Sequence, residues 1–466
     1  MTSTLIRTTG RKLHLAGLFM IMVGLLFSCG KDEDDLSYLL STIPSSAGCV
    51  IGINTTSLLQ DIGVKVENGE LKPSKDTQNL LNSLPENNKN ILSAFVDGQS
   101  GVDPRGAVLF YDLNRSYITF GLSDTEAFKN FYEKQSGQKF SETKGVAVCG
   151  NAAVKGAQVW LAIQNSSIDP VVINGYASLS ESQSFLKNKI SEKVAALDKD
   201  FNGWAKISVL TNNTMNFHQT TMFNLFSASL FDDAEDIFFT SEFEKGKFKT
   251  KLNVLNEKGK PAKYLLPTDK IDGSTIEALD VNSNIMVGAA ISSGLVKQLD
   301  KLGTTLAGVA FSGFSQTIES VDGTVAVGFS NPDNMMENFK GVVTTNGDGA
   351  MKLKVFLSNI SPLQEEGRLI KFGKGTMSGS LSSKLCGDML KGACVGIISD
   401  FPLYPVSEMS AYPATDNTFS SIEYFCLRMV PDDESVALEL IVASKDKGSN
   451  FLMTILKDNV KPSPVQ

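Results

Sequence analysis

Histidine is nearly absent from this sequence. The chain of 466 residues has two, His14 and His218, and the first lies in a segment that we expect to be removed. A zinc site with two histidines is therefore excluded, and a serine–histidine pair could use only His218. The sequence also has no Gly-x-Ser-x-Gly nucleophile elbow and no Cys-x-x-Cys pair. We therefore assign no catalytic residue.

Positive charge, tryptophan and long apolar runs are also scarce. The formal net charge is −8, which argues against binding to nucleic acid, because contacts to phosphate need an excess of Lys and Arg. Two tryptophans stand against 28 phenylalanines, so a surface for stacking glycans is not favoured. The longest apolar run after the N-terminus, Ile285 to Val296, is interrupted by Gly and Ser. The remaining composition, 42% hydrophobic and 20% charged, is typical of globular domains.

The N-terminus has the parts of a secretory signal peptide. Arg7, Arg11 and Lys12 supply the positive charge, and an apolar stretch runs from Leu15 to Phe27. This stretch is shorter than the ~20 apolar residues that cross a bilayer. We therefore expect residues 1–28 to be cleaved. Without these three cations the chain keeps 40 basic residues against 51 acidic ones, a net charge of −11.

The residues at the predicted cleavage site, Leu26, Phe27, Ser28 and Cys29, resemble the lipobox of bacterial lipoproteins. In that family the cysteine is lipidated and becomes the mature N-terminus, so the resemblance implies lipidation at Cys29. Phe27 is larger than is usual at its position, and a secreted protein with an accidental Cys29 is the alternative. An acyl anchor holds because each buried CH₂ contributes ~0.8 kcal/mol.

A lysine and an acidic run follow the predicted lipidation site. They are Lys31, Asp32, Glu33, Asp34 and Asp35. This order resembles the surface-export signal of some Gram-negative lipoproteins, whereas like-charge runs in general are solvated tethers. We expect residues 29–40 to form a lipidated acidic tether at the outer membrane. Display on the cell surface is favoured, and a periplasmic facing stays open.

Three landmarks occur twice in the same order, which predicts an internal repeat. The first set is a turn–strand–helix unit at 43–62, a strand that ends at the capping Ser123, and a hairpin at 237–255. The second set is a turn–strand–helix unit at 279–302, a strand that ends at the capping Ser330, and a hairpin at 422–442. The repeat predicts two related units, 41–270 and 271–466. The alternative is that the same landmarks arise without duplication, because turns, strands and capped helices alternate in any α+β protein.

Hairpins outnumber strand–helix–strand units in the pattern, which predicts an α+β fold of antiparallel sheets with helices packed on one face. Two further hairpins are predicted, one between 107–111 and 117–121 and one between 146–149 and 158–163. The segment from Ser184 to Leu197 has apolar residues on one stripe, so it predicts an amphipathic helix.

The segment 43–59 reads Ile-Pro-Ser-Ser-Ala-Gly, followed by Ile-Asn-Thr and Ser-Leu-Leu. This opening resembles a family of lipoproteins of gut-type anaerobic Gram-negative bacteria that carry a large domain of unknown function. The match concerns mainly residues 40–63, the overall length and the lipobox. That family has no assigned chemistry, so the resemblance implies no activity and no catalytic residue.

Asp198, Asp200 and Asn202, followed by Gly203, match the first half of a calcium loop. Carboxylates at alternating positions can converge on a hard cation, and glycine permits the sharp turn. The twelfth position holds Val209 in place of a bidentate glutamate. The alternative is an Asn-Gly turn that leads into a strand. Calcium is the only cofactor that the sequence suggests.

Five cysteines remain after Cys29, and an odd number cannot all pair. Cys386 and Cys394 enclose a short loop and could form a disulfide in an oxidising compartment. The alternative is that both are buried thiols, as we expect for the other three, which lie in apolar strands.

Other catalytic arrangements are weakly supported. Ser-x-x-Lys occurs four times after the predicted cleavage site, and the copy at Ser184 and Lys187 opens the predicted amphipathic helix. The acidic clusters at 232–236 and 432–434 flank hairpins, so they are more typical of solvated loops than of glycosidase carboxylates.

The combined expectation is a non-catalytic binding or structural module, anchored to the outer membrane by its lipid. Its partner would be an unknown protein or glycan. The alternative is a cell-envelope hydrolase, of glycosidase or Ser/Lys type. If a pocket exists, we expect it near residues 260–285, between the predicted repeats.

Overall fold

The computed structural model describes residues 35–67, 70–83, 99–163, 168–209, 230–296, 318–330, 335, 337–346, 350–400 and 421–460. The chain divides into two compact units. Unit 1 comprises Met1–Leu210, Ile237–Lys245 and Gly448–Gln466, and unit 2 comprises Thr211–Asp236 and Gly246–Lys447. This division differs from the expected boundary at residue 270, because unit 1 also contains the segments Ile237–Lys245 and Gly448–Gln466.

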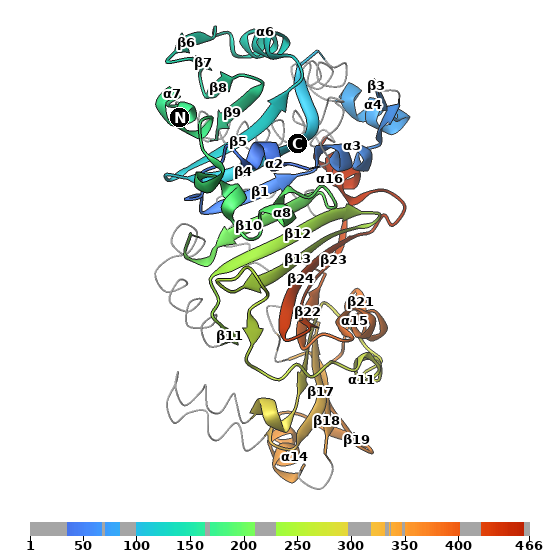
Figure 1. Cartoon of the computed structure of the whole chain (residues 1–466). Helices are drawn as coiled ribbons and strands as arrows, with labels where there is room; N and C mark the ends of the chain where they lie inside the picture. Colours follow the sequence, from blue (N-terminus) through green and yellow to red (C-terminus); the bar gives the residue numbers. More distant parts are fainter. Residues whose placement is uncertain are drawn as a thin grey trace, which may run out of the picture. The chain divides into compact units, whose positions relative to one another are not determined.

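The main sheet of unit 1 is antiparallel. Its paired strands follow the order β10 (Phe201–Lys206), β1 (Cys49–Ile53), β4 (Val102–Asp112), β5 (Arg115–Leu122), β9 (Gln158–Ala162), β8 (Ala152–Lys155), β7 (Val146–Cys149) and β6 (Ser141–Thr143). β12 (Asp236–Glu244) lies beside β10 (Figure 1). A separate hairpin pairs β2 (Val64–Glu67) with β3 (Glu70–Pro73).

The hairpin predicted at 107–121 is confirmed as β4 and β5. Asp112 pairs with Arg115, so the loop between the strands consists of Leu113 and Asn114 alone. Both of these residues have positive φ, at 48° and 62°. Two positive φ values belong to a type I′ turn, whose twist matches that of the flanking strands.

The hairpin predicted between 146–149 and 158–163 is wrong in its pairing. The intervening strand β8 lies between β7 and β9, so these two strands are not neighbours. β8 is short and has buried alanines at its start. Alanine has a low β-propensity, so the sequence pattern does not indicate this strand.

Helices of unit 1 contact both faces of its sheet. They are α2 (Ser37–Leu40), α3 (Thr55–Asp61), α4 (Lys75–Ser83), α6 (Thr125–Ser136), α7 (Pro170–Tyr176), α8 (Ser191–Ala195) and α16 (Phe451–Val460). On one face, Leu58 of α3 and Met453 of α16 pack with Phe120 of β5. On the other face, the Phe185 ring lies 5.2 Å from the Trp204 ring.

The single helix predicted from Ser184 to Leu197 is wrong. The segment forms a 3₁₀ turn, η2 (Phe185–Lys187), after a first turn η1 (Glu181–Gln183), and only then the short helix α8. Asn188 is extended, and its side chain accepts a hydrogen bond from the Ile190 N–H at 3.1 Å. Such a local bond competes with the helix backbone. Phe185, Ile190 and Val194 are buried nonetheless.

The folded body begins before residue 41. Leu36, Leu39 and Leu40 are fully buried, and Asp35 accepts a hydrogen bond from the Ser37 N–H at 2.8 Å. The expected tether of residues 29–40 is therefore shorter at its C-terminal end, because three leucines so close together favour burial in the core.

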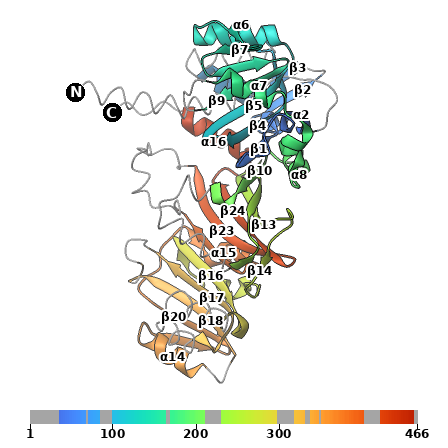
Figure 2. The same ribbon diagram turned by 60° about the vertical axis from the view of Figure 1, so that its left-hand side comes forward.

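The main sheet of unit 2 is also antiparallel. Its order is β19 (Leu363–Glu366), β20 (Leu369–Lys374), β18 (Phe339–Thr345), β17 (Val321–Phe329), β16 (Ile285–Ile291), β22 (Val395–Ser399), β23 (Ile422–Asp432), β24 (Ser435–Ser444) and β13 (Lys247–Leu255) (Figure 2). Two short pairs accompany it, β11 (Phe231–Asp232) with β14 (Lys263–Tyr264), and β15 (Asn282–Ser283) with β21 (Leu381–Ser382). The hairpin predicted at 422–442 is confirmed as β23 and β24.

The two sheets share a strand order. In unit 1 the pairing runs β10-β1-β4-β5-β9-β8, and in unit 2 it runs β22-β16-β17-β18-β20-β19. In each, the first strand in the chain pairs with the next main strand on one side and with a much later strand on the other. The predicted α+β class with antiparallel sheets is confirmed.

Three helices pack on the sheet of unit 2 within the described ranges. They are α11 (Gly273–Glu277), α14 (Met351–Ser358) and α15 (Ser383–Leu390). Ile276 of α11 and Leu390 of α15 form a core cluster with Met286 and Ile398. Leu353 of α14 packs in a second cluster. We name the side of the sheet that faces α11 and α15 the helix face, because the candidate site lies on the other side.

Candidate functional site

The side of the unit 2 sheet opposite the helix face is apolar across four neighbouring strands. Residues that share a cross-strand register lie on the same face, and alternate residues of one strand lie on the same side. Two rows result from the pairings of β16, β22, β23 and β24. Together they form what we call the open apolar face: Val287, Ile397, Leu427 and Leu440 in one row, and Ala289, Val395, Met429 and Leu438 in the other.

Other apolar clusters cover this side of the sheet at both ends. Near α14, Leu353 and Leu357 pack with residues of β17, β18 and β20. At the opposite end, Leu230 and Phe231 pack with Val436 of β24. The open apolar face lies between these clusters, and its residue Met429 also packs against the second one.

The side chains of the open apolar face keep part of their contact with solvent. Val287 and Val395 are each 38% exposed, and Leu438 is 36% exposed. The other five are half-buried. A contiguous apolar surface on a folded protein typically marks a binding site.

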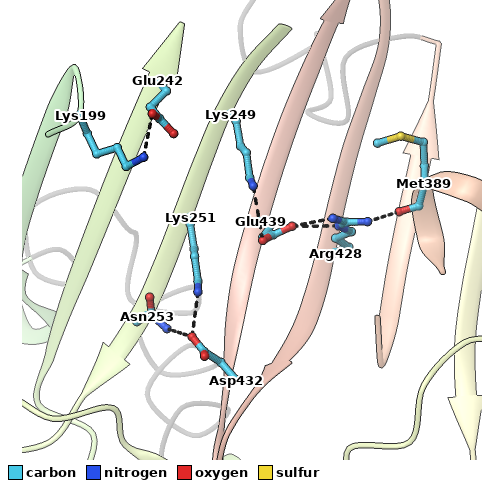
Figure 3. Close-up of polar contacts among 9 residues, drawn as sticks. All are labelled: Lys199, Glu242, Lys249, Lys251, Asn253, Met389, Arg428, Asp432 and Glu439. Carbon is cyan, nitrogen blue, oxygen red and sulfur yellow. Dashed lines mark hydrogen bonds and ion pairs between the residues drawn. The ribbon is translucent and has the colours of Figure 1, made fainter. Parts of the chain in front are cut away.

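The helix face of the same strands carries charge instead. The Arg428 guanidinium donates to Glu439 Oε2 from Nε at 3.0 Å and from Nη2 at 2.8 Å, and it also donates to the Met389 carbonyl of α15 (Figure 3). Lys249 Nζ lies 3.9 Å from Glu439 Oε1. Arg428 and Glu439 keep only 20% and 10% of their side-chain exposure. The hydrogen bond from Arg428 to the Met389 carbonyl links α15 to the sheet, and the ion pair lies on the helix face.

A second polar arrangement on the helix face surrounds Asp432. Its carboxylate lies 2.9 Å from Lys251 Nζ and accepts from Asn253 Nδ2 at 3.2 Å (Figure 3). The hydrogen bond from Lys251 lowers the pKa of Asp432. This aspartate belongs to the acidic cluster at 432–434, and its contacts are those of a cross-strand ion pair rather than of a catalytic acid.

Unit 1 contains a pair of facing carboxyl groups, Asp61 at the end of α3 and Asp200 before β10. Asp200 is 3% exposed and accepts from Ser57 Oγ and from the Phe243 N–H, each at 2.5 Å. Asp61 Oδ1 accepts from Asn450 Nδ2 at 2.7 Å. Burial, together with the charge of Asp200, raises the pKa of Asp61 to about 8, and burial also raises the pKa of Asp200. The pair is therefore able to hold a proton at neutral pH.

The predicted calcium ligands Asp198, Asp200 and Asn202 do not converge on one point. Asn202 Nδ2 donates to Asp198 Oδ1 at 3.0 Å and to the Ala196 carbonyl at 2.6 Å. Asp200 is directed to Ser57 and Phe243 instead. Within the described ranges, no group of three or more His, Cys, Asp or Glu side chains is placed to hold a metal ion.

Cys386 and Cys394 are free thiols and do not form the disulfide that the sequence left open. Their side chains belong to different clusters, because Cys386 packs in the core under α15 and Cys394 packs with Leu230 and Phe231. Burial raises the pKa of Cys386 to about 12 and that of Cys394 to about 11, so neither thiol is activated.

Other predicted residues have structural roles or lie outside the described residues. Ser184 Oγ donates to the Glu181 carbonyl and accepts from the Leu186 N–H, as a cap of η2. Several residues lie outside the described ranges: Cys29, Lys31, Asp32, Glu33, Asp34 and His218. No helix among the described residues is both long enough and apolar enough to span a bilayer.

Sequence reasoning missed the open apolar face and the Asp61–Asp200 pair. A signal for the face exists, since β22 reads Val-Gly-Ile-Ile and β24 has apolar residues in both alternating positions. Strands that are apolar on both sides read as continuous apolar runs. No comparable signal exists for Asp61, because its partner is distant in the sequence.

No protein-family model and no curated protein matches the chain. Among solved structures, three crystal forms of TP0453 are similar to it. Form IV is 8% identical and covers 46% of this chain and 79% of its own, with a TM-score of 0.31. Form I is 9% identical and covers 75% and 95%, with a TM-score of 0.28, and form III is 8% identical and covers 75% and 96%, with a TM-score of 0.30. No conclusion on function rests on this similarity.

Proposed function

We propose that this protein is a lipid-anchored, non-catalytic binding module of the outer membrane, and that its open apolar face binds an acyl chain. The observation that carries the proposal is the face itself. Eight apolar side chains from four strands form a continuous surface, and Val287, Val395 and Leu438 remain more than one-third exposed. The lipobox at Cys29 supports a location beside lipid.

The dimensions of the face suit one extended chain. Neighbouring strands lie ~4.8 Å apart, so a row across four strands spans ~14 Å between the outer backbones. A single acyl chain extends through half of a ~30 Å hydrocarbon core, which is about 15 Å. A chain that lies across the strands would therefore contact one row along most of its length.

The chemistry of the face favours the chain over the head group. None of its eight side chains carries a hydrogen-bonding group or a charge, apart from the weakly polar sulfur of Met429. Binding would rest on apolar burial, at about 25 cal/mol per Å² of buried area. We therefore expect tolerance of different head groups and weaker binding of shorter chains.

Val395→Glu is expected to weaken binding of a fluorescent fatty acid, cis-parinaric acid, at least about tenfold. The substitution places a carboxylate in the middle of the face. A bound acyl chain would remove water from this charge without supplying a hydrogen bond or an ion pair, which costs binding free energy. Because Val395 is 38% exposed, the variant should fold. Fluorescence titration and displacement by palmitate measure the effect.

Val171→Glu is the matched control, because Val171 is 51% exposed on α7 of unit 1. It should bind the probe as the wild type does. Equal losses in both variants, or no loss in Val395→Glu, would contradict the proposal. So would concentration-dependent dimerisation through this face without lipid binding, seen by sedimentation.

Cys29→Ser is expected to abolish incorporation of labelled palmitate and to release the protein from the membrane fraction, since the thiol is the proposed acylation site. Metabolic labelling and fractionation check this result. Protease treatment of intact cells then tests the facing. Digestion before the outer membrane is broken supports surface display, and protection until breakage supports the periplasmic side.

A cell-envelope hydrolase remains the second candidate, because the Asp61–Asp200 pair can hold a proton as acid–base catalysts do. Ser57, Phe243 and Asn450 donate to three of the four oxygens of this pair, however, and Asp200 is 3% exposed. A substrate would have to displace these donors. The geometry therefore favours an architectural role for the pair.

A further inference from the structure

The Asp61–Asp200 pair joins four segments of unit 1 that are distant in the sequence. Asp61 ends α3, Asp200 leads into β10, and the Phe243 N–H that binds Asp200 belongs to β12. Asn450, which precedes α16, donates from Nδ2 both to Asp61 Oδ1 and to the Phe243 carbonyl, each at 2.7 Å. Its Oδ1 accepts from the Leu452 N–H at 2.8 Å, so all polar atoms of this side chain are used.

One oxygen of the pair lacks a donor. Asp61 Oδ2 is buried, and no N–H or O–H of the described residues donates to it. The Asp200 carboxyl is in hydrogen-bonding contact with Asp61. Two carboxylates in contact repel each other, whereas one carboxylic acid can donate to one carboxylate. A proton on the pair itself would supply this donor.

Apolar side chains also pack α16 against unit 1 close to the Asp61–Asp200 pair. The Phe451 ring stacks with the Phe243 ring at 6.4 Å, and Met453 and Leu456 pack with Leu58 of α3. Electrostatic repulsion between Asp61 and Asp200 would therefore act next to Asn450, which directly precedes the first turn of α16.

We propose that Asp61 and Asp200 share one proton, and that this proton acts as a pH-dependent latch that holds the C-terminal helix α16 on unit 1. When the proton is lost, the second negative charge meets no cation in contact among the described residues. Loss of the proton therefore favours release of α16 from α3.

The Asn450 donor favours the ionised form of Asp61, whereas burial and the charge of Asp200, which have larger effects, favour the protonated form. Glu242 of β12 adds to the negative field, and its partner is Lys199, whose Nζ lies 2.8 Å from Glu242 Oε1 (Figure 3). On α16, Lys457 pairs with Asp76 of α4 at 2.8 Å, and Asp458 adds a further acid. Asp61 is the only charged side chain of α3.

The sign of the pH effect follows from the raised pKa of Asp61. Release brings water to this carboxyl and lowers its pKa from about 8 toward the ordinary aspartate value of ~4. Between these values the released state binds fewer protons, so a rise in pH favours release by up to tenfold per pH unit. Above about pH 8 both states are ionised and the effect levels off.

Hydrogen exchange of peptides from 451–458 tests the latch in the full chain. After correction for the intrinsic exchange rate, we expect protection in the wild type to fall by about three- to tenfold per pH unit between pH 6 and 8. The lower figure allows for solvent screening of the half-buried Asp61. Asp61→Asn replaces the acid by an amide that donates permanently, so its protection should not depend on pH.

Asp76→Asn is the control, because it removes an exposed partner of α16 and should keep the slope of the wild type. A flat wild-type profile, or a slope in Asp61→Asn equal to that of the wild type, overturns the proposal. Infrared difference spectra of the wild type between pH 6 and 9 are independent of any variant. Loss of a carboxylic-acid C=O band supports the shared proton, and absence of this band at pH 6 overturns it.

Discussion

Arg428→Met is expected to lower the free energy of unfolding of unit 2 by about 3 kcal/mol. The substitution keeps much of the apolar stem but removes the guanidinium that donates twice to Glu439 and once to the Met389 carbonyl. Glu439 is then a buried carboxylate whose remaining ion-pair partner among the described residues is Lys249, at 3.9 Å. Removing one partner of a buried ion pair costs about 3–5 kcal/mol, and the remaining lysine places our value at the lower end.

Urea unfolding, followed by hydrogen exchange of β23 and β24, measures this loss. Arg368→Met is the matched control, since Arg368 and Asp322 form an ion pair with 60% and 54% of their side chains exposed. That variant should lose less than about 1 kcal/mol. Arg428→Met combined with Glu439→Leu should recover most of the stability. Equal losses at the two arginines would show that burial of the Arg428 pair has no energetic consequence.

Gly387→Ala is expected to destabilise unit 2 by about 1–3 kcal/mol, although alanine is the better helix former. Gly387 lies inside α15, and a Cβ there would be 2.6 Å from the Gly273 carbonyl oxygen and 2.9 Å from Glu277 Cγ. The oxygen belongs to the backbone of α11 and cannot move away independently of the helix. Overpacking of this kind outweighs the gain of about 1 kcal/mol in helix propensity.

Gly175→Ala is the control of opposite sign. Gly175 lies inside α7, and a Cβ there would meet no atom within 4 Å. The same substitution should therefore stabilise unit 1 by about 0.5–1 kcal/mol. Thermal unfolding of the two variants gives the comparison. A stabilised Gly387→Ala would mean that α11 and α15 can separate at no cost.

Much of the antiparallel architecture follows from local sequence. The strands β4, β5, β23 and β24 are long, rich in apolar residues and joined by tight turns, so both hairpins could be predicted. The helix α3 could also be predicted, because Asn54 caps it and glycine follows at Gly63. In each of these cases the information lies within one short stretch of the chain.

The internal repeat stays our proposal, and the shared strand order supports it. Two of the three landmarks fall on equivalent strands, since β1 corresponds to β16, and β23 occupies the place of β12. The second landmark does not, because Ser123 follows β5 and Ser330 follows β17, whereas the pairings equate β5 with β18. A serine after a strand is too common a cap to fix the register of a weak repeat.

The candidate sites could not be predicted because they depend on distant pairing. Val287 and Leu440 share a row only after β16, β22, β23 and β24 have paired, and these strands are far apart in the sequence. The sequence motif predicts that Asp200 is a calcium ligand together with Asp198 and Asn202. Hydrogen bonds from Ser57 and Phe243, which are distant in the sequence, fix the orientation of the Asp200 side chain instead. Local motif matching has no access to such partners.

The position of α16 has a consequence for the order of folding during synthesis. Unit 1 receives its first strand at Cys49, yet Leu456, near the C-terminal end of the chain, completes the core around Leu58. The ribosome therefore finishes every described strand of unit 2 before unit 1 can close. Until then the part of the α3 surface that α16 covers remains exposed, which makes a chain that stops short of α16 a substrate for chaperones and proteases.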